Sequence, residues 1–241
     1  MACKRSGVRV PIAPPSLFKK WGGMKIGIIG AGNIGGALTH RLTSLGYEVK
    51  VANSRGPETL KELSEATGAE AVTAADAVKG VDLIVITIPE KAVPNLPKGL
   101  VSNLPEDFPI VDTNNYYPVR DGKIDEIENG KPESVWVSEQ LGHPVIKAFN
   151  NIYAQKLKDD GKPSGSKDRL ALPVSGDNKK AKDIVMKLID DIGFDPIDAG
   201  SLDESWNHQP GTPVYGTSLG AEDTKKGLAD ASPNRPKDFR A

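Results

Sequence analysis

The sequence has very little cysteine, few aromatic residues and no long apolar run. Its single cysteine, Cys3, leaves no pair for a disulfide bond and no cysteine set for a metal site or a nucleophile. No run approaches the roughly 18 apolar residues of a membrane-spanning helix. The 31 basic and 32 acidic side chains nearly cancel and form no basic stripe, so we expect neither nucleic acid nor a membrane as a partner. A reducing, cytoplasmic location fits these absences.

Residues 1–23 differ in composition from the rest of the chain. They contain basic residues but no acidic ones, and prolines stand at positions 11, 14 and 15. The prolines and Arg9 interrupt the apolar stretch that a signal peptide needs, and the prolines oppose the helix of a transit peptide. The run Gly-Val-Arg-Val-Pro looks like a translated transfer-RNA gene arm. We therefore expect a disordered leader that results from a start assigned too early, with Met24 as the true start.

Residues 24–54 predict a strand, a glycine turn, a helix and a second strand. The GxGxxG motif follows an apolar strand and opens a helix with one apolar face; it consists of Gly30, Ala31, Gly32, Asn33, Ile34 and Gly35. The first glycine permits a tight turn, the second lets the backbone approach a pyrophosphate, and the third lets the helix pack closely on the strand. The helix N-terminus attracts phosphate. The motif therefore predicts a dinucleotide-binding loop, with a purely structural turn as the alternative.

The end of the second strand indicates which dinucleotide binds. NAD enzymes usually place an acidic residue about 20 residues after the glycine loop, to hold the ribose 2′-hydroxyl. Asn53, Ser54 and Arg55 occupy that place here. A hydroxyl, backbone amides and a guanidinium suit a 2′-phosphate, so the sequence favours NADP(H). The alternative is that Arg55 is simply a solvated residue after a strand.

Strand and helix patterns alternate along the rest of the chain. Apolar strands are predicted at residues 81–88, 109–113, 144–149, 169–174 and 194–198, with helices at 58–67, 74–79, 133–142 and after Asp177, and a surface loop at 118–135. This alternation predicts an α/β protein with a Rossmann-type, doubly wound, mainly parallel sheet and a small C-terminal α/β extension. We expect a nucleotide-binding domain at 24–152, a small lobe at 153–231 and a flexible tail at 232–241.

Small or amide side chains follow several predicted strands. In parallel α/β sheets, ligands bind outside the carboxyl ends of the strands. We therefore expect the nicotinamide end of the cofactor to lie near these ends, which carry Thr87, Ile88, Pro89, Asn114, Ala148, Phe149 and Asn150.

Motifs for side-chain catalysis are missing. The sequence contains no YxxxK, no GxSxG and no cluster of metal ligands, and its histidines, His40, His143 and His208, have no partner nearby in sequence. Hydride transfer between two bound rings needs orientation and exclusion of water more than an acid or base, whereas carbonyl reduction usually needs a proton donor. We therefore assign no catalytic residue and no metal site.

Taken together, these motifs resemble the coenzyme F420-dependent NADP oxidoreductases, and the nucleotide-binding part is also similar to that of the STEAP ferric reductases. The likeness runs from Met24 to about Val214, and the segments GAGNIGG, ANSRGPE, KAFNNIYA and ESWxxQPGTPxYG are closest to a bacterial branch. The resemblance implies that residues 31–34, Ser54 and Arg55 hold NADP, near Thr87, Val93 and Ala148. It also implies a second substrate, F420 or a flavin, stacked on the nicotinamide, and a homodimer.

Three hypotheses about function follow from the sequence. The first is an NADPH-dependent oxidoreductase that transfers hydride to a deazaflavin or flavin. The second is reduction of a small carbonyl or imine, polarised by Asn114, Asn150 or His208. The third is a redox sensor that binds NADP without turnover.

Overall fold

The structure is a computed structural model that describes residues 23–241, so the predictions for residues 1–22 lie outside it. The strands of the described part are β1 (Lys25–Ile29), β2 (Glu48–Ala52), β3 (Glu70–Ala71), β4 (Leu83–Ile86), β5 (Ile110–Asp112), β6 (Ile146–Lys147), β7 (Ala171–Val174) and β8 (Asp195–Asp198). Its α-helices are α1 (Asn33–Ser44), α2 (Lys61–Thr67), α3 (Ala74–Ala77), α4 (Pro118–Asp121), α5 (Asp125–Glu128), α6 (Glu133–Leu141), α7 (Ala154–Asp159), α8 (Lys179–Asp191) and α9 (Ala221–Ala229). Residues 23–241 also contain four short 3₁₀ helices: η1 (Pro57–Leu60), η2 (Glu90–Asn95), η3 (Asp203–His208) and η4 (Lys237–Phe239).

The main sheet is parallel throughout and has the strand order β3-β2-β1-β4-β5-β6. This order reverses direction between β1 and β4, as in Rossmann sheets, and it confirms the predicted α/β fold class. Because all the strands run the same way, their carboxyl ends meet at one edge. We call this edge, with the loops that follow β1, β2, β4, β5 and β6, the carboxyl edge.

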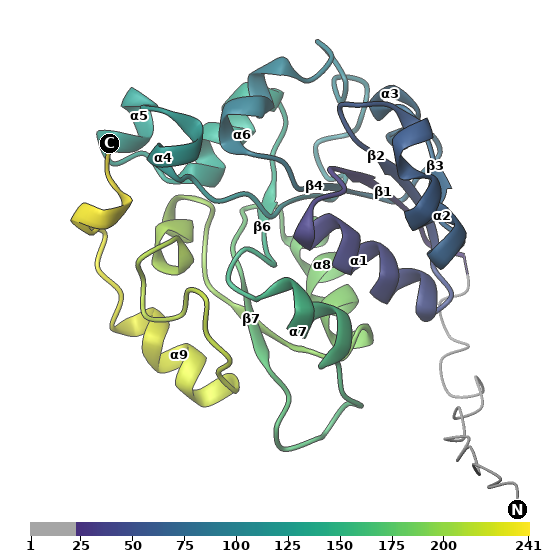
Figure 1. Cartoon of the computed structure of the whole chain (residues 1–241). Coiled ribbons are helices and arrows are strands. Elements are labelled where there is room, and N and C mark those ends of the chain that lie inside the picture. The colour runs from purple at the N-terminus through teal and green to yellow at the C-terminus, as the bar shows by residue number, and fades with distance from the viewer. Residues whose placement is uncertain (1–22) are drawn as a thin grey trace, which may run out of the picture.

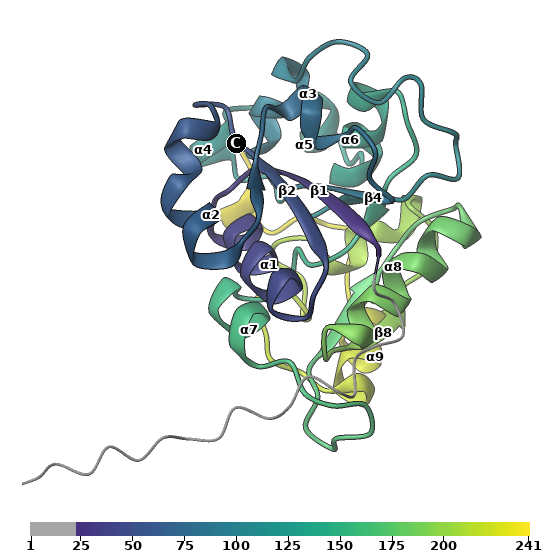
Figure 2. The same cartoon turned by 90° about the vertical axis from the view of Figure 1, so that its right-hand side faces the viewer.

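Both faces of the sheet are covered. Ile28, Val51 and Val85 pack on one side with apolar residues of α1, α7 and α8. Ile84 and Ile86 point the other way and pack with residues of α3 and of the segment after β4. Alternate residues of a strand point to opposite faces, so burial on both sides explains why β4 reads as an unbroken apolar run. Figure 1 and Figure 2 show α1 and α7 side by side on one face.

A second, two-stranded parallel sheet is formed by β7 and β8. An isolated antiparallel bridge joins it to the main sheet, because Lys147 and Ser175 exchange both backbone hydrogen bonds, at 2.8 and 3.0 Å. The C-terminal strands are therefore tied to the end of β6. The expected boundaries between the nucleotide-binding domain, the small lobe and the tail, after residues 152 and 231, stay predictions.

Two sequence-based expectations about helices are wrong. Residues 118–135 were expected to be a surface loop but contain α4 and α5, since Pro118 starts a short helix and Gly122 ends it. The predicted cap of α8, Asp177, instead accepts a hydrogen bond from Leu202 N, and Asn178 caps the helix by accepting from Ala181 N. The expected cap of α3 by Thr73 is confirmed.

The C-terminal residues lie along α4 and α5 (Figure 1). Arg235 forms an ion pair with Glu133 at 2.6 Å, and the backbone amide of Ala241 donates to Glu128 at 3.0 Å. The flexibility expected for residues 232–241 stays a prediction. None of the helices in the described residues is long and apolar enough to cross a membrane.

Candidate functional site at the carboxyl edge

The glycine loop after β1 packs so tightly that two of its positions exclude a side chain. Gly30 has a φ of +114°, and a Cβ there would lie 2.0 Å from the carbonyl oxygen of Thr87. A Cβ on Gly35 would lie 1.9 Å from the carbonyl oxygen of Gly30. The first and third glycines therefore have the structural roles that the motif predicts, a sharp turn and a close approach of α1.

Gly32 differs from these two glycines. A Cβ there would meet nothing within 4 Å, so packing inside the protein does not demand glycine at this position. Gly32 is the N-cap of α1, no side chain caps the helix, and its first turn has no acidic residue. The first amides of α1 are thus available to an anion, with the positive end of the helix dipole behind them. The open space around Gly32 and the free amides of the first turn of α1 lie at the same place, and together they suit a pyrophosphate.

The turn after β2 is shaped by Asn53. Its side-chain oxygen accepts from Arg55 N at 2.9 Å, and its amide donates to Thr59 Oγ1 at 2.8 Å. Ser54 and Arg55 are exposed. No described residue pairs with the Arg55 guanidinium, so it can meet a phosphate from outside. The structure adds an acid that the sequence analysis missed, because the Glu58 carboxylate folds back over Gly56.

The ends of β4 and β5 are joined through Asn114. Its side-chain oxygen accepts from Ile88 N at 2.9 Å and so fixes the backbone of residues 87–89, which are expected to lie near the nicotinamide. Its side-chain amide nitrogen is buried, and no described residue accepts a hydrogen bond from it. A buried donor without an acceptor costs about 1–3 kcal/mol. This nitrogen therefore suits an acceptor brought by a ligand, such as a carbonyl or ribose oxygen.

The end of β6 contains a strained residue. Phe149 is fully buried and has a φ of +62°, in the left-handed region that non-glycine residues rarely adopt. The sharp turn brings Asn150 beside Asn115, and the two side chains bond at 3.1 Å. Strain of this kind persists where the surrounding structure enforces it, often at binding sites. Ala148 and Val93 are both buried.

A buried ionic network lies behind this edge, and the sequence analysis missed it. The Lys147 ammonium is fully buried, 3.5 Å from Glu133 Oε2, and donates to Ser134 Oγ at 3.2 Å and to the Asn114 carbonyl at 3.3 Å. Ser134 in turn donates to Asp112 at 2.6 Å. The network thus holds the backbone of Asn114. Two features of the sequence could have indicated this network. One is a lysine inside the apolar run of residues 145–149, and the other is an aspartate at the end of a buried strand.

Glu90 is the unusual member of the network. It is fully buried, and no described group bonds to either of its carboxylate oxygens. Burial and the nearby Asp112 and Glu133 raise its pKa well above 4.5, although Lys147 acts the other way. Asp112 and Glu133 already face two cations, Lys147 and Arg235, so a neutral Glu90 leaves these four charges balanced.

His208 is also fully buried. Its Nδ1 lies 2.9 Å from Asn150 Oδ1 and its Nε2 lies 3.0 Å from Ser175 Oγ. The Asn150 amide nitrogen donates to the His208 carbonyl, at 2.7 Å, so the Asn150 oxygen must accept from Nδ1–H. Nε2 then carries no proton, and the Ser175 hydroxyl lies within hydrogen-bond distance of both Nε2, at 3.0 Å, and the Ala199 carbonyl oxygen, at 3.2 Å. Burial and Lys147 lower the pKa of His208 well below 6.5. His208 is therefore neutral, with both ring nitrogens bonded within the protein.

The carboxyl edge thus brings together most of the predicted residues. Gly30 contacts Thr87, Ile88 bonds to Asn114, Lys147 reaches Asn114, and Asn115 bonds to Asn150. Ser54 and Arg55 follow β2, which pairs with β1. Val93 lies in an apolar cluster with Tyr116 and Trp136, and Ile88 packs against this cluster. The roles of the predicted site residues in binding stay predictions.

Comparison with known proteins places the chain in a family. Residues 25–116 match the family model described as NADP oxidoreductase, coenzyme F420-dependent. The structure resembles hypothetical protein SMa0349 from Sinorhizobium meliloti, with 30% sequence identity, a TM-score of 0.69 and coverage of 82% of this chain and 95% of that one. It also resembles a candidate F420-dependent NADP reductase from Arthrobacter sp. FB24, with 25% identity, a TM-score of 0.63 and coverage of 75% and 86%.

More distant likenesses concern smaller parts or the fold alone. Over 53 residues the chain is 51% identical to protein YjhV of Escherichia coli (strain K12), an alignment that spans 22% of this chain and 39% of that curated relative. An imine reductase from Pseudomonas sp. shares the fold at 20% identity and a TM-score of 0.51, over 76% of this chain and 57% of the other. The glycine loop, the strand order and the likeness at 30% identity over 82% of this chain agree: the chain belongs to the coenzyme F420-dependent NADP oxidoreductase family.

Proposed function

We propose that the protein is an NADPH-dependent oxidoreductase that transfers hydride between NADP(H) and a flavin-like or deazaflavin (F420) acceptor. The observation that carries this proposal is the arrangement of the carboxyl edge. An open glycine loop meets a helix N-terminus there, next to strand ends that carry amide side chains in place of proton donors. Family membership supports the nucleotide half of the proposal.

The proposed nucleotide site is built mainly from backbone. Residues 30–35 would hold the pyrophosphate through the first amides of α1, and Ser54 and Arg55 would hold the 2′-phosphate. Asn53 fixes the turn that presents them. Thr87, Ile88, Pro89 and Asn114 would line the nicotinamide ribose, and the unpaired amide of Asn114 would donate to it. Ala148, Phe149 and Asn150 would support the ring end, together with the buried Val93 of η2.

The proposed hydride transfer requires no acid or base from the side chains. When bound, NADPH supplies a hydride, which carries two electrons and one proton to the acceptor ring, and a second proton comes from water. The chain orients the two rings and excludes water from the space between them, and both contributions lower the barrier without an acid or base. The buried Lys147 network contributes indirectly by holding the Asn114 backbone.

Reduction of a small carbonyl or imine is the second candidate. The observation that favours it is the hydrogen-bonded series from His208 through Asn150 to Asn115, which reaches the partly exposed edge. A proton donor must hold a proton that it can release to the substrate. His208 is neutral and both its nitrogens are bonded internally, to Asn150 and Ser175. Hydride transfer between rings therefore ranks first.

NADPH oxidation measured against a panel of acceptors tests the proposal. The panel contains F420, FMN, FAD, ferric chelates and small carbonyls and imines, each with an acceptor-free control. We expect NADPH to be consumed only when F420 or a flavin is added. Consumption with carbonyls or imines alone would favour the second candidate, and tight binding of NADPH without turnover across the panel would favour a redox sensor. The cytoplasmic location and the homodimer expected from the sequence also remain proposals.

A further inference from the structure

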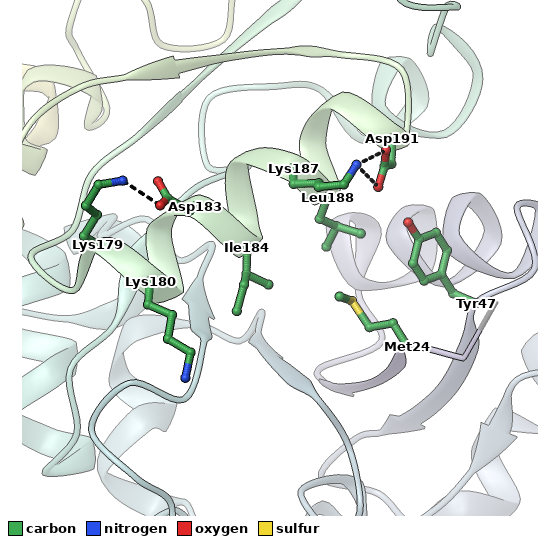
Figure 3. Close-up of a pocket in the computed structure, with 9 residues that line it drawn as sticks. All are labelled: Met24, Tyr47, Lys179, Lys180, Asp183, Ile184, Lys187, Leu188 and Asp191. Carbon is green, nitrogen blue, oxygen red and sulfur yellow. Dashed lines mark hydrogen bonds and ion pairs between the residues drawn. The ribbon is translucent and has the colours of Figure 1, made fainter. Parts of the chain in front are cut away.

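A hollow of about 580 Å³ lies between α8 and the residues that precede β1 and β2 (Figure 3). Ile184 and Leu188 of α8 form one wall, and Met24 and Tyr47 form the other. Because Met24 and Tyr47 come directly before strands, this hollow lies at the amino ends of β1 and β2, opposite the carboxyl edge. The segment that borders the far end of the carboxyl edge comes instead from the C-terminal residues.

Residues 235–239, which we call the strap, pack against the segment that follows β5. The rings of Phe239 and Tyr117 are tilted by 42°, with centroids 6.5 Å apart. The Arg235 guanidinium lies 5.2 Å from the centre of the Tyr116 ring, within the range of a cation–π contact. Both tyrosines directly follow the two asparagines at the end of β5. The strap is therefore adjacent to a strand end that would hold the nicotinamide.

A glycine on the loop after His208 leaves room for the strap. Gly211 has a φ of +89°, and a Cβ there would lie 2.8 Å from Pro236 and 3.0 Å from Phe239. A larger residue would push the strap outward and would also be strained in this backbone conformation. The strap is therefore part of the close packing on this side of the protein, between the loop after His208 and the segment after β5.

Arg235 makes the main contact between the strap and the interior. Only 13% of its side chain is exposed, and its Nη2 donates to Glu133 Oε1 at 2.6 Å and to Gln209 Oε1 at 3.2 Å. Glu133 is fully buried, so this ion pair is largely shielded from water. Removing one partner of such a pair leaves an uncompensated charge inside the protein. Arg235 is therefore held firmly between two residues of different segments.

From Glu133, one series of contacts leads to the end of β5. The other carboxylate oxygen of Glu133 lies 3.5 Å from Lys147 Nζ, which donates to the Asn114 carbonyl oxygen at 3.3 Å. The Asn114 side chain holds Ile88 N and carries the amide nitrogen that no described residue bonds. Arg235 thus supports the backbone of the residue that would donate to the nicotinamide ribose.

From Gln209, a second series leads to the end of β6. The Gln209 side-chain oxygen, which accepts from Arg235, also accepts from the Glu133 backbone amide at 3.2 Å. The preceding residue, His208, accepts from the Asn150 amide through its carbonyl at 2.7 Å, and its ring bonds to the Asn150 oxygen at 2.9 Å. Both series therefore begin at Arg235 and end at an asparagine of the carboxyl edge.

We propose that Arg235 is a positioning residue that fixes both strand ends around the nicotinamide ring. Its two series of contacts support Asn114 on one side and Asn150 on the other. Hydride transfer depends on the orientation of this ring, whereas the phosphates would be held by the half of the edge after β1 and β2. The inference rests on the nucleotide half of the proposed function and requires no particular hydride acceptor.

The fluorescence of bound NADPH tests this inference without an acceptor, because reduced nicotinamide fluoresces more strongly when a protein immobilises the ring. Arg235→Met keeps an apolar side chain beside Tyr116 but removes the ion pair. We expect it to lose at least about half of the fluorescence enhancement seen with wild type. The Kd of NADPH should change by less than about threefold, since the phosphate contacts remain. The matched control is Lys237→Met, whose exposed side chain makes none of these contacts.

Turnover and a second variant extend the test. With the acceptor that wild type uses, Arg235→Met should lower kcat at least about tenfold through loss of orientation. Phe239→Ala removes the packing of the strap on Tyr117 and Gly211 but leaves the Arg235 ion pair in place. We expect it to lower the fluorescence enhancement in the same direction, with an unchanged Kd for NADPH. Circular dichroism shows whether each variant is folded.

A folded Arg235→Met variant that matches wild type in fluorescence and kcat would overturn the inference. If that variant does not fold, the same result for Phe239→Ala would overturn it. A loss of NADPH affinity as large as the loss of fluorescence would also do so, because the strap would then serve binding in general and not the ring. Failure of the proposed function differs: wild type would bind no NADPH, which overturns both, or would bind it without turnover, and the fluorescence comparison then still decides the inference.

Discussion

The two halves of the carboxyl edge are built in different ways. The half after β1 and β2 is mostly backbone, with an open glycine loop, an uncapped helix N-terminus and an exposed arginine. The half after β5 and β6 depends on buried side chains, above all Lys147 and the groups around it. The shape of the first half depends on local geometry that a short sequence motif encodes. The second half depends on contacts between residues far apart in the sequence.

The largest expected effect comes from removing the central cation of the buried network. Lys147→Met leaves the buried Asp112 and Glu133 with one cation fewer, and breaking a buried ion pair in this way costs about 3–5 kcal/mol. Urea unfolding would measure the loss. The control is Lys25→Met, which removes an exposed pair with Glu48 at 3.2 Å and should cost less than about 1 kcal/mol. Equal losses for the two variants would show that the second half of the edge does not depend on its ion pairs.

The glycine loop offers a comparison between neighbouring residues. Gly35→Ala puts a methyl group 1.9 Å from the Gly30 carbonyl oxygen, so α1 must shift, at a cost of about 1–3 kcal/mol in unfolding free energy. A Cβ on Gly36 meets nothing within 4 Å, and Gly36→Ala is expected to stabilise the helix by about 0.5–1 kcal/mol. Thermal or urea unfolding distinguishes the two. Similar effects of both changes would mean that the loop is not held by close packing.

The pH dependence of stability should identify Glu90 as a buried neutral acid. Its folded-state pKa is raised above 4.5 by burial, Asp112 and Glu133, so the folded state holds a proton that the unfolded state releases. This contribution is full below pH 4.5 and is lost as the pH rises through the folded pKa. Glu90→Gln does not titrate and should gain stability relative to wild type as the pH rises. Parallel curves of unfolding free energy against pH would contradict this, and exposed Glu48→Gln is the control.

The smallest effect on turnover is expected at His208. His208→Ala removes two internal hydrogen bonds and should lower stability by about 1–3 kcal/mol, while the folded protein keeps most of its rate. Steady-state rates measured well below the melting temperature would test this. A fall in rate of about 100-fold or more would give His208 a role in proton transfer and favour carbonyl or imine reduction.

The sequence predicted the parts of the molecule that depend on local patterns. The strand, loop and helix of residues 25–44 and the parallel sheet follow from periodicity and from glycine spacing. The network of Lys147 could not be predicted in this way, because its members come from α6, from the end of β5 and, through the pair of Arg235 with Glu133, from the C-terminal residues. The position of the Glu58 carboxylate near the β2 turn was not predictable either, because it depends on the backbone turn at Gly56 and not on the residues that directly follow the strand. The link between β6 and β7 depends on a single pair of residues and leaves no periodic signal.

The central claim is that the first half of the edge binds NADP(H) through its 2′-phosphate. The most direct test is the ratio of NADPH to NADH affinity, measured by titration for wild type, Arg55→Ala and the charge control Glu58→Gln. We predict that wild type prefers NADPH and that Arg55→Ala weakens NADPH binding by about 1.5–3 kcal/mol, the value of a hydrogen bond to a charged group, while NADH binding barely changes. Glu58→Gln should keep the preference. Equal losses for both nucleotides in Arg55→Ala, or a wild type that binds NADH as tightly as NADPH, would contradict the account.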